Sequence, residues 1–315
     1  MAFVLITGGA GFIGSHLVET LLKKGEKVRV IDNFLTGKKE NLSFIKDYPS
    51  EQIEVIEGDI RDVETCKNVM KGIDYVLHQA ALPSVPRSVK DPITTNEINI
   101  KGTLNLLLAA KDMNVKRFVY ASSSSIYGDQ PVSPKEESLN PAPLSPYAGS
   151  KLAAEYYCSI FYHVYGLETV SLRYFNVFGP RQDPNSPYAA VIPKFITAFL
   201  QNKPPEIYGD GEQTRDFTYV EDVVVANILA MEAPNVGGEV FNIACGQNIS
   251  INQLASIIKD IMQKDIDPVH VAPRPGDVRH SLASIEKAKK FLHYSPKWTL
   301  KEGLRKTIEY YFSGT

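Results

Sequence analysis

Tyr147 and Lys151 are spaced so that a phenol and an ammonium group can act together. They follow Ser145 and Pro146, which suit the cap and the first position of a helix, so we expect a helix from residue 146 that ends at Gly166. Residues four apart share one face of a helix. A phenol has a pKa of about 10, and nearby positive charge favours its ionised form. The pair therefore predicts a general base that takes a proton from a hydroxyl group, although this spacing also occurs by chance.

Three glycines near the N-terminus predict a loop that binds a pyrophosphate. Gly8, Gly11 and Gly14 follow the apolar run of residues 3–6 and precede a helical pattern that ends near Lys24. Missing side chains let the backbone approach the ligand, and the helix N-terminus supplies free N–H groups and a partial positive charge. The spacing is GxxGxxG rather than the commoner GxGxxG. By itself, such a turn is also compatible with a tight strand–helix connection.

Asp32 makes a dinucleotide the favoured ligand of the glycine loop. It ends the second expected strand, where a carboxylate binds the adenosine ribose in dinucleotide-binding folds. Such a carboxylate repels a 2′-phosphate, which favours NAD over NADP. Lys38 and Lys39 would weaken this preference if they faced the ribose, but a solvated position is the simpler interpretation. Asp59, after the third strand, is equally compatible with a contact to the adenine amine and with a turn.

Four consecutive serines, Ser122 to Ser125, end the fifth expected strand. The carboxyl ends of parallel strands face the ligand crevice of an open α/β sheet, and residues 78–81 end the fourth strand at the same edge. A serine hydroxyl at this edge can hydrogen-bond the reacting oxygen and relay a proton to Tyr147. The alternative is a polar loop without a specific role. The position favours a functional role for one or two of the four serines.

The elements that would position these residues alternate between strand and helix patterns. We expect strands at residues 2–7, 27–32, 53–57, 75–79, 117–122 and 169–174, with helices between them, including a long one at 95–114. This rhythm predicts an α/β fold with a doubly wound parallel Rossmann sheet. We expect residues 1–176 to form a NAD-binding domain and residues 177–315 a smaller α/β C-terminal substrate domain. Segments within 221–245 are expected to return to the first domain.

The second half of the chain has a different pattern. Proline and glycine become frequent after residue 177, and only two later stretches, 252–263 and 302–311, look helical. A long loop at 272–281 is expected between them. This half should therefore contain more irregular structure than the first.

Composition excludes several classes of function. The 315 residues are 43% hydrophobic and 22% charged, with a formal net charge of −2, so we expect neither nucleic acid nor a membrane as a partner. The three cysteines are isolated, which predicts buried thiols in a reducing, cytoplasmic compartment. The histidines show no metal-ligand spacing, so we expect no metal site.

Six segments together resemble the extended short-chain dehydrogenase/reductase family of nucleotide-sugar enzymes. They are TGGAGFIG, SSSSIYGD, YAGSK, RYFNVFGPRQDP, YGDGEQTRDFTYVEDV and RPGDVRHS. Within this family the chain is most similar to UDP-hexose 4-epimerases that accept N-acetylated sugars. The resemblance implies that NAD oxidises the sugar at C4 to a transient 4-keto intermediate and then returns the hydride to the other face.

The resemblance also implies a set of site residues. Tyr147 would be the base, Lys151 its partner on the nicotinamide ribose, and Ser123 a bridge between the sugar 4-oxygen and Tyr147. The implied cofactor site comprises Gly8, Gly11, Phe12, Ile13, Gly14, Asp32, Asn33, Thr36, Gly37, Asp59, Ile60, Gln79, Ala80, Ala81, Asn99, Ser122, Tyr147, Lys151 and Tyr174. The implied UDP-sugar site comprises Ser84, Ser123, Tyr147, Asn176, Ala190, Val191, Tyr208, Arg215, Arg274, Asp277 and Ser281.

Serines at four positions guide the choice among related activities. Related dehydratases carry an Asp-Glu pair where Ser124 and Ser125 stand, and related decarboxylases carry a glutamate at the second of these positions, so both activities are disfavoured. Glucose-restricted epimerases, which resemble this chain elsewhere, carry a tyrosine at the position of Ser281 and a lysine at the position of Ser84. Two serines leave room for a 2-acetamido group, so we expect UDP-GlcNAc/UDP-GalNAc to be substrates, with UDP-Glc/UDP-Gal also accepted.

Two alternatives and one assembly state remain open from the sequence. UDP-glucuronate epimerisation is possible because Arg181 could reach a carboxylate, while Asn176 argues against it, since relatives acting on uronates carry a threonine there. A non-catalytic NAD-binding regulator is disfavoured because the Tyr-Lys pair and the UDP contacts are intact. The two long helices carry many apolar residues, including Leu104, Leu107, Leu108, Tyr156, Tyr157 and Ile160. Some of these are expected in the core, and the rest resemble the family's dimer interface and predict a homodimer.

Overall fold

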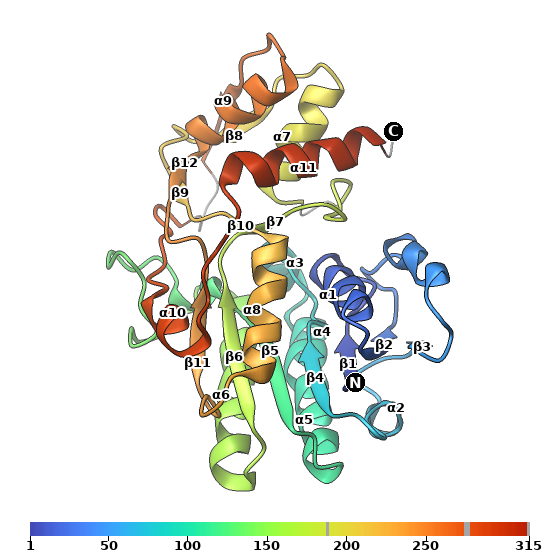
Figure 1. Cartoon of the computed structure of the whole chain (residues 1–315). Coiled ribbons are helices and arrows are strands. Elements are labelled where there is room, and N and C mark those ends of the chain that lie inside the picture. The colour runs from blue at the N-terminus through green and yellow to red at the C-terminus, as the bar shows by residue number, and fades with distance from the viewer. Residues whose placement is uncertain (187–188, 274–277, 314–315) are drawn as a thin grey trace.

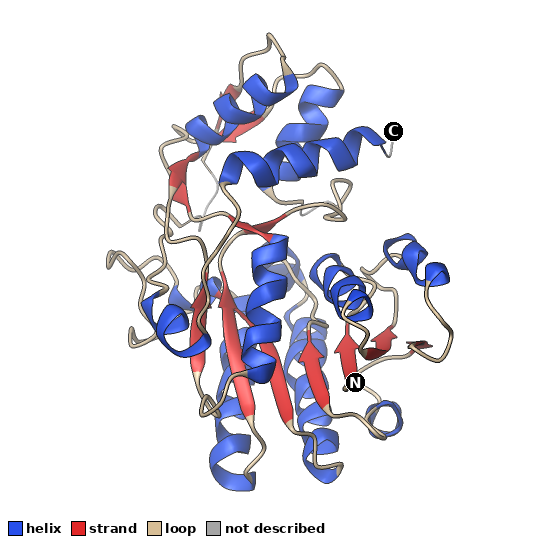
Figure 2. Ribbon diagram, viewed as in Figure 1, coloured by secondary structure: helices blue, strands red, loops and turns tan. Residues whose placement is uncertain are grey.

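Seven parallel strands form the central sheet of the protein. A computed structural model describes residues 1–186, 189–273 and 278–313. The strand order is β11-β6-β5-β4-β1-β2-β3, and every neighbouring pair is parallel (Figure 2). The strands are β1 (Phe3–Thr7), β2 (Lys27–Asp32), β3 (Ile53–Glu57), β4 (Tyr75–His78), β5 (Arg117–Ser123), β6 (Thr169–Tyr174) and β11 (Val240–Ile243). The predicted doubly wound parallel sheet is confirmed.

Helices cover both faces of this sheet, as Figure 1 shows. On one face α1 and α8 pack with β4, β6 and β11 in one apolar cluster. On the other face α2, α5 and α6 pack against β1, β4 and β5. Because each central strand is covered on both sides, its side chains are apolar in both directions, as parallel sheets require. The helices are α1 (Phe12–Lys23), α2 (Val63–Val69), α3 (Val85–Lys90), α4 (Pro92–Asn96), α5 (Gly102–Asp112), α6 (Pro146–Tyr165) and α8 (Val220–Glu232).

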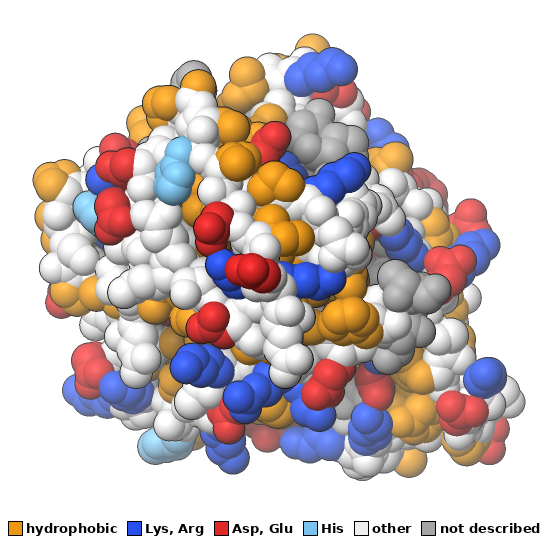
Figure 3. Space-filling model, turned by 90° about the horizontal axis from the view of Figure 1, so that it is seen from above, with side chains coloured by type: hydrophobic (Ala, Val, Ile, Leu, Met, Phe, Trp, Pro, Cys, Tyr) orange, Lys and Arg blue, Asp and Glu red, His pale blue; other side chains and the backbone are white. Residues whose placement is uncertain are grey.

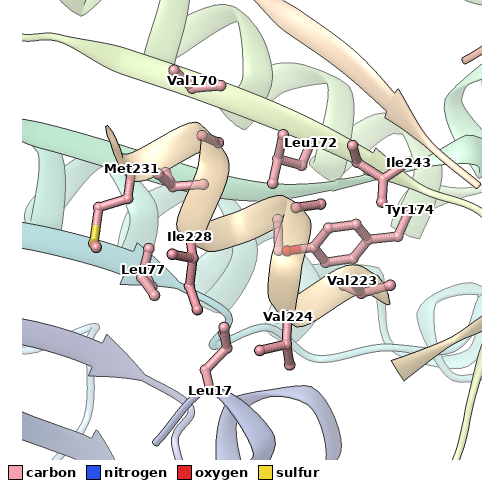
Figure 4. Close-up of a cluster of buried hydrophobic side chains, with 14 of the residues drawn as sticks. Leu17, Leu77, Val170, Leu172, Tyr174, Val223, Val224, Ile228, Met231 and Ile243 are labelled. Carbon is pink, nitrogen blue, oxygen red and sulfur yellow. The ribbon is translucent and has the colours of Figure 1, made fainter. Parts of the chain in front are cut away.

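The helix α8 and the strand β11 are part of the sheet domain, although they lie late in the chain: β11 is an edge strand and α8 packs on the sheet. Val224, Ile228 and Met231 of α8 point toward the sheet in Figure 4, and Leu17 of α1 is part of the same buried cluster. Burial of each such side chain contributes about 1.5–3 kcal/mol. The chain therefore leaves the sheet after β6 and comes back through α8 and β11.

The rest of the C-terminal half forms a second lobe with its own core, above the sheet in Figure 1. Its cluster contains Phe195 and Phe199 of α7, Leu254 and Ile258 of α9, and Leu304 of α11. Three two-stranded sheets border this core: β7 with β10, β8 with β13 and β9 with β12. The bounds are β7 (Val177–Phe178), α7 (Val191–Leu200), β8 (Glu206–Tyr208), β9 (Thr214–Arg215), β10 (Thr218–Tyr219), β12 (Ile249–Ser250), α9 (Ile251–Met262), β13 (Val269–Val271) and α11 (Leu300–Ser313). The helix α10 (Glu286–Leu292) instead packs on the central sheet beside β11.

The helix that carries Tyr147 and Lys151 begins and ends as its sequence predicts. The Ser145 side chain accepts a hydrogen bond from the Ala148 N–H at 3.1 Å, and Pro146 occupies the first turn. At the other end Gly166 adopts φ +71°, a left-handed conformation that favours glycine. Local cap chemistry therefore fixes both ends of α6.

The long helix expected at residues 95–114 is interrupted. It consists of α4, a π-helical segment (Glu97–Lys101) and α5, and Asp91 caps its start by accepting from the Thr94 N–H at 3.0 Å. The wider π turn places Asn99 against Leu82 and Ser150. This long-range contact left no periodic signal in the sequence.

Other elements escaped prediction because they are short or aperiodic. They are α3, α7, α10, the two-residue strands, and two 3-10 helices at Lys39–Asp47 and Ser124–Tyr127. One burial prediction was wrong: Cys66 and Cys158 are buried, but Cys245 is only half-buried. Cys245 lies in the loop that follows β11, outside the covered sheet.

The surface carries charges of both signs. On the face viewed from above in Figure 3, basic and acidic side chains are interspersed. Among the described helices, none has the length and apolarity needed to cross a bilayer. Within the same described residues, no group of three or more His, Cys, Asp or Glu side chains could hold a metal ion.

Candidate active site

The glycine loop joins β1 to α1 and leaves room only for hydrogen atoms at two of its positions. Gly8 has φ +68°, and a Cβ there would lie 2.8 Å from the Ala80 backbone nitrogen. A Cβ on Gly14 would lie 2.1 Å from the Gly8 carbonyl oxygen. Gly11 occupies the cap position of α1 without a side chain to bind the first N–H groups. These groups remain available to an anion at the helix N-terminus.

Asp32 lies beside this loop and is 7% exposed. Its carboxylate accepts hydrogen bonds from the Ala10 N–H at 2.9 Å and the Phe34 N–H at 2.8 Å. Burial raises the pKa of Asp32, and these backbone hydrogen bonds oppose the rise. A Cβ on Gly37 would lie 2.8 Å from the carboxylate, so the following loop closes tightly against it. Asp32 thus presents a fixed acceptor at the end of β2.

The neighbouring charges are paired with each other. Lys38 binds Asp183 at 2.9 Å and Lys39 binds Glu57 at 3.2 Å, so neither lysine lies against Asp32. Asp59 accepts from Arg61 and from the Asn33 amide, and the Arg61 guanidinium lowers the pKa of Asp59 to about 2. Asp59 is therefore an anion held in place, which is more than a simple turn requires.

The predicted catalytic groups meet at the carboxyl end of β5. Lys151 is 4% exposed, and its Nζ donates to the Ala121 carbonyl at 2.8 Å. The Ser123 hydroxyl lies close enough to Tyr147 to influence its pKa, and the Ser123 Oγ accepts a hydrogen bond from the Ser125 hydroxyl at 2.9 Å. One helix face and one strand end thus bring together the phenol, the ammonium and the serine.

Burial sets the direction of both pKa shifts in this pair. It raises the pKa of Tyr147, and the nearby Ser123 hydroxyl opposes the rise. Burial also lowers the pKa of Lys151 to about 7. The prediction that Lys151 and an oxidised nicotinamide together favour the phenolate stays a prediction. In the protein alone the low-dielectric site destabilises the ammonium. A base at this site needs further positive charge.

A buried ion pair supports the catalytic helix from below. Glu155, two turns after Tyr147, binds Arg173 of β6 at 2.6 Å and accepts from the Ser122 hydroxyl at 2.6 Å. Arg173 Nη1 also donates a hydrogen bond to the Tyr127 hydroxyl oxygen at 2.7 Å. Among the four serines, Ser122 therefore anchors the strand, while Ser123 is the one that lies close to the phenol.

A second buried chain of hydrogen bonds connects β1 and β4 to the interrupted helix. The Thr7 hydroxyl lies 2.6 Å from His78 Nδ1, and Thr103 lies 2.8 Å from His78 Nε2. Burial lowers the pKa of His78 to about 3, so the imidazole is neutral near pH 7. Asn99 donates to the Ser150 hydroxyl at 2.9 Å. It therefore supports α6 from behind.

Two cavities hold most of the predicted site residues. The larger, of about 730 Å³, runs from the glycine loop past Asp32 to Tyr147. Of the implied cofactor residues, its lining contains Gly8, Gly11, Phe12, Ile13, Gly14, Asp32, Asn33, Thr36, Gly37, Asp59, Ile60, Gln79, Ala80, Ala81, Ser122, Tyr147, Lys151 and Tyr174. Asn99 does not line it and acts through its contacts with Leu82 and Ser150.

The smaller cavity, of about 260 Å³, lies in the C-terminal lobe. Its lining includes the predicted substrate residues Asn176, Ala190, Val191, Tyr208 and Arg215. Ala190 also borders the larger cavity, so the two cavities adjoin.

Five substrate predictions fall elsewhere. Ser123 lines neither cavity, although its neighbours Ala121 and Ser122 line the larger one. Ser84 caps α3 with φ +99° and lines the larger cavity. Ser281 lines neither cavity; its N–H donates to the Thr214 carbonyl at 3.1 Å. Arg274 and Asp277 lie outside the described residues.

Two residues in the cavity linings, Gln182 and Gln213, were missed from the sequence, whereas Arg181 was considered only as a partner for a sugar carboxylate. Arg181 Nη1, Gln182 Oε1 and Gln213 Oε1 are buried and have no hydrogen-bond partner among the residues that the structure describes. Arg181 also pairs with Glu19. Buried polar atoms are almost always paired in folded proteins, so unpaired ones on residues that line a cavity make these residues candidates for contact with a polar ligand. Their environment depends on tertiary contacts that no local pattern reveals.

Residues 4–244 match the NAD dependent epimerase/dehydratase family. The chain belongs to this family. A putative UDP-glucose 4-epimerase from Methanocaldococcus jannaschii is 38% identical over 309 residues, covering 98% of this chain and 97% of that relative. Relatives named as UDP-glucuronate 4-epimerase and UDP-glucuronic acid decarboxylase also match.

Two solved structures show the same fold. UDP-N-acetylglucosamine 4-epimerase from Methanobrevibacter ruminantium, in complex with UDP-N-acetylmuramic acid, is 46% identical with a TM-score of 0.94 and covers 100% of this chain and 99% of its own. The UDP-glucose 4-epimerase of Thermus thermophilus, in complex with NAD, is 38% identical with a TM-score of 0.90. The match covers 99% of this chain and 100% of that structure's chain.

NAD is the cofactor of this epimerase-family protein, and the larger cavity fits it. The glycine loop can adopt its tight turn at the N-terminus of α1 because Gly8 and Gly14 lack side chains that would collide with neighbouring backbone, and this turn would place free N–H groups beside a pyrophosphate. Asp32 would accept from the adenosine ribose, and Lys151 would face the nicotinamide end of the cavity. The oxidised nicotinamide carries the positive charge that the buried Tyr147–Lys151 pair lacks.

Proposed function

We propose that the protein is a 4-epimerase of UDP-hexoses that interconverts UDP-GlcNAc with UDP-GalNAc and UDP-Glc with UDP-Gal. The observation that carries this proposal is the composition of the catalytic corner. Tyr147 lines the cofactor cavity with the Ser123 hydroxyl close by, while the two residues that follow Ser123 are also serines. These side chains can remove a proton from a hydroxyl group and return it. The serines supply no carboxylate for a dehydration or a decarboxylation.

The proposed mechanism assigns a proton transfer to each side chain at the catalytic corner. Tyr147 takes the proton from the sugar 4-hydroxyl, and Ser123 holds the same oxygen by a hydrogen bond. The chemistry that bound NAD would supply is reversible hydride transfer at C4 of the sugar. Lys151, which donates to the Ala121 carbonyl, adds positive charge beside the phenol when it is protonated. Tyr147 then gives the proton back to the new 4-hydroxyl.

The two adjoining cavities suit a ligand that is held at one end and turns at the other. We propose that the lobe formed within residues 177–315 holds the UDP, with Arg215 on the diphosphate, because an arginine fork matches phosphate oxygens. The sugar would then extend into the larger cavity beside Tyr147. Anchoring the UDP while the 4-keto sugar rotates exposes either face to the same hydride donor.

Dehydration and decarboxylation are disfavoured by the residues after Ser123. Both reactions proceed from a 4-keto sugar but need an additional acid or base near C5. Ser124 and Ser125 cannot supply a carboxylate. The Ser125 hydroxyl donates a hydrogen bond to Ser123 Oγ, which supports a role for Ser125 in positioning Ser123.

UDP-glucuronate epimerisation is the second candidate. It is supported by the unpaired Arg181 Nη1 at the larger cavity and by the Bacillus cereus UDP-glucuronic acid 4-epimerase, whose structure matches with a TM-score of 0.92 at 35% identity. Against it, Arg181 already pairs with Glu19, and Asn176 is committed to the Asp216 carbonyl at 3.0 Å. We therefore rank it below the hexose substrates.

The proposal for the preferred sugar is based on the serines at positions 84 and 281. Ser84 lines the larger cavity. Ser281 lies on the segment that pairs with β9, outside both cavity linings, so its role in sugar size rests on the resemblance alone. A pocket enlarged for an acetamido group rejects the smaller hexose only weakly. The enzyme would therefore accept both pairs of sugars.

We also propose a cytoplasmic homodimer. Exposed apolar side chains line α5 and α6, with Ile160 46% and Val164 65% exposed. A second copy would cover this face by packing helix against helix. The free cysteines are compatible with a reducing compartment.

Product analysis by proton NMR tests the proposed reaction. UDP-GlcNAc, UDP-Glc and UDP-glucuronate are each incubated with purified enzyme without added NAD, and again with it. We expect UDP-GalNAc and UDP-Gal to form in the first two samples. Turnover of the uronate alone would replace our proposal by the second candidate, and no turnover in any sample would favour a non-catalytic NAD-binding protein.

A further inference from the structure

Gln213 lies in the wall of the smaller cavity, just before β9. Its side chain is more than nine-tenths buried, with 8% of the residue exposed. The Nε2 group donates to the Tyr208 carbonyl at 2.8 Å. The Gln213 carbonyl in turn accepts from the Ile251 N–H at 3.1 Å. Both its backbone and its side chain are therefore fixed by neighbours.

The contact with Tyr208 determines which way the amide faces. A backbone carbonyl can only accept, so the nitrogen of the Gln213 amide must be the atom that faces it. The oxygen consequently points the other way. Gln213 Oε1 is buried and has no partner among the described residues. A buried acceptor without a donor is costly, and the residue that carries it lines the smaller cavity. The oxygen itself has almost no accessible surface, so a ligand donor would reach it only after a small shift of the cavity wall.

The cavity around Gln213 has apolar walls and one cation. Phe178, Phe217 and Ile251 are among its lining residues. Arg215 also lines it, two residues beyond Gln213. Residues two apart on an extended strand face the same side. A single wall therefore presents a neutral acceptor and a guanidinium, and the remaining surface is suited to a flat, weakly polar ring.

We propose that Gln213 Oε1 accepts a hydrogen bond from the nucleoside half of the substrate, which makes Gln213 a specificity-determining residue. This inference rests on the proposed function, which places a UDP-sugar in the cavity. The nucleoside offers two kinds of donor, the uracil N3–H and the ribose hydroxyls. If the donor is N3–H, Gln213 also discriminates against cytidine, whose N3 carries no hydrogen and would meet the oxygen as a second acceptor.

A cycle of protein variants and ligand analogues tests the contact. UDP, N3-methyl-UDP, 2′-deoxy-UDP and 3′-deoxy-UDP are titrated by calorimetry into the enzyme as purified with its cofactor. The same ligands are titrated into Gln213→Met and into a matched control, Gln201→Met, whose side chain is exposed in the same lobe. Calorimetry reports binding, so the result does not depend on catalytic turnover.

We expect Gln213→Met to weaken UDP binding about tenfold, with Gln201→Met unchanged. One analogue should lose about the same factor in the wild type and nothing further in Gln213→Met. Loss confined to N3-methyl-UDP identifies the base as the donor, and loss confined to a deoxy analogue identifies the ribose. Equal losses for every analogue in both proteins would overturn the proposal and leave Gln213 a structural anchor of Tyr208.

Two further readouts keep the result decisive. If Gln213→Met does not fold, Gln213→Asn and the wild-type analogue series replace it, and wild-type affinities that are the same for UDP and all three analogues would refute the contact. Turnover of UDP-sugars is measured in parallel. Turnover without any analogue effect overturns only the role of Gln213, whereas absent UDP binding together with absent turnover overturns the proposed function as well.

Discussion

At the scale of single residues, the catalytic pair is electrostatically incomplete in the protein alone. Burial raises the pKa of Tyr147 and lowers that of Lys151 to about 7. Both changes favour the neutral forms, a phenol and an amine. A positive nicotinamide ring would oppose the first change by stabilising the phenolate. The site is therefore arranged to gain its base strength when NAD binds.

The lowered pKa of Lys151 predicts a pH-dependent stability. Its folded pKa is about 7 against 10.5 ordinarily, so between these values the unfolded chain binds the proton more strongly. Stability of the cofactor-free protein should then rise with pH across this window, by at most about 1.4 kcal/mol per pH unit, and be insensitive to Lys151 below it. Urea unfolding of wild type and Lys151→Met measures this. The stability difference between the two proteins should change in favour of the wild type as pH rises; a constant difference would contradict the assignment.

Ser281 provides the residue-scale test of sugar size. We expect Ser281→Tyr to reduce turnover of UDP-GlcNAc by about tenfold or more, while UDP-Glc turnover changes much less, because the added ring would occupy space needed by the acetamido group. Ser281→Ala, which keeps the side chain small, serves as the control. Initial rates with both substrates provide the comparison. Unchanged UDP-GlcNAc turnover in Ser281→Tyr would rule out this pocket argument.

At the scale of elements, the junction of β1 and α1 should control cofactor binding. Gly14→Ala places a methyl group 2.1 Å from the Gly8 carbonyl oxygen, so the loop must shift and the pyrophosphate contacts with it. We expect bound NAD to fall roughly tenfold or more. Gly149→Ala in α6 is the matched control, because a Cβ there has nothing within 4 Å. Absorbance of NAD released from denatured protein measures both; equal NAD content would show that the loop does not contact the cofactor.

Elements defined by local signals were predictable, and those defined by distant contacts were not. The ends of α6 follow from Ser145, Pro146 and Gly166, whose effects act within one turn. The π-helical turn around Asn99 depends on Leu82 and Ser150, which are brought there by folding. The paired strands of the second lobe contain two or three residues each, too few to show a period.

The same division applies to the candidate site. Tyr147, Lys151 and the glycines carry their chemistry in their spacing, so the sequence alone indicates them. Gln213 gives no such signal, since a glutamine becomes informative only when its buried oxygen is found without a partner. The pKa of Lys151 likewise reflects burial produced by the complete fold.

At the scale of the whole molecule, the exposed face of α5 and α6 predicts self-association. Ile160 is 46% exposed although it is a large apolar side chain on α6. We expect Ile160→Glu to convert a dimer into a monomer, since burying unpaired carboxylates in an interface is costly. Val132→Glu, at a 50% exposed loop position, is the control. Sedimentation velocity separates the two states; a monomeric wild type, or a dimer unaffected by Ile160→Glu, would exclude this interface.

The fate of the hydrogen at sugar C4 tests the central claim most directly. UDP-GlcNAc carrying deuterium at C4 is converted in ordinary water, and the product is examined by NMR and mass spectrometry, with Tyr147→Phe as the inactive control. Our account predicts UDP-GalNAc that retains deuterium at C4, because the hydride leaves and returns within one site. Protium from solvent at C4, or a product that has lost water, would contradict it.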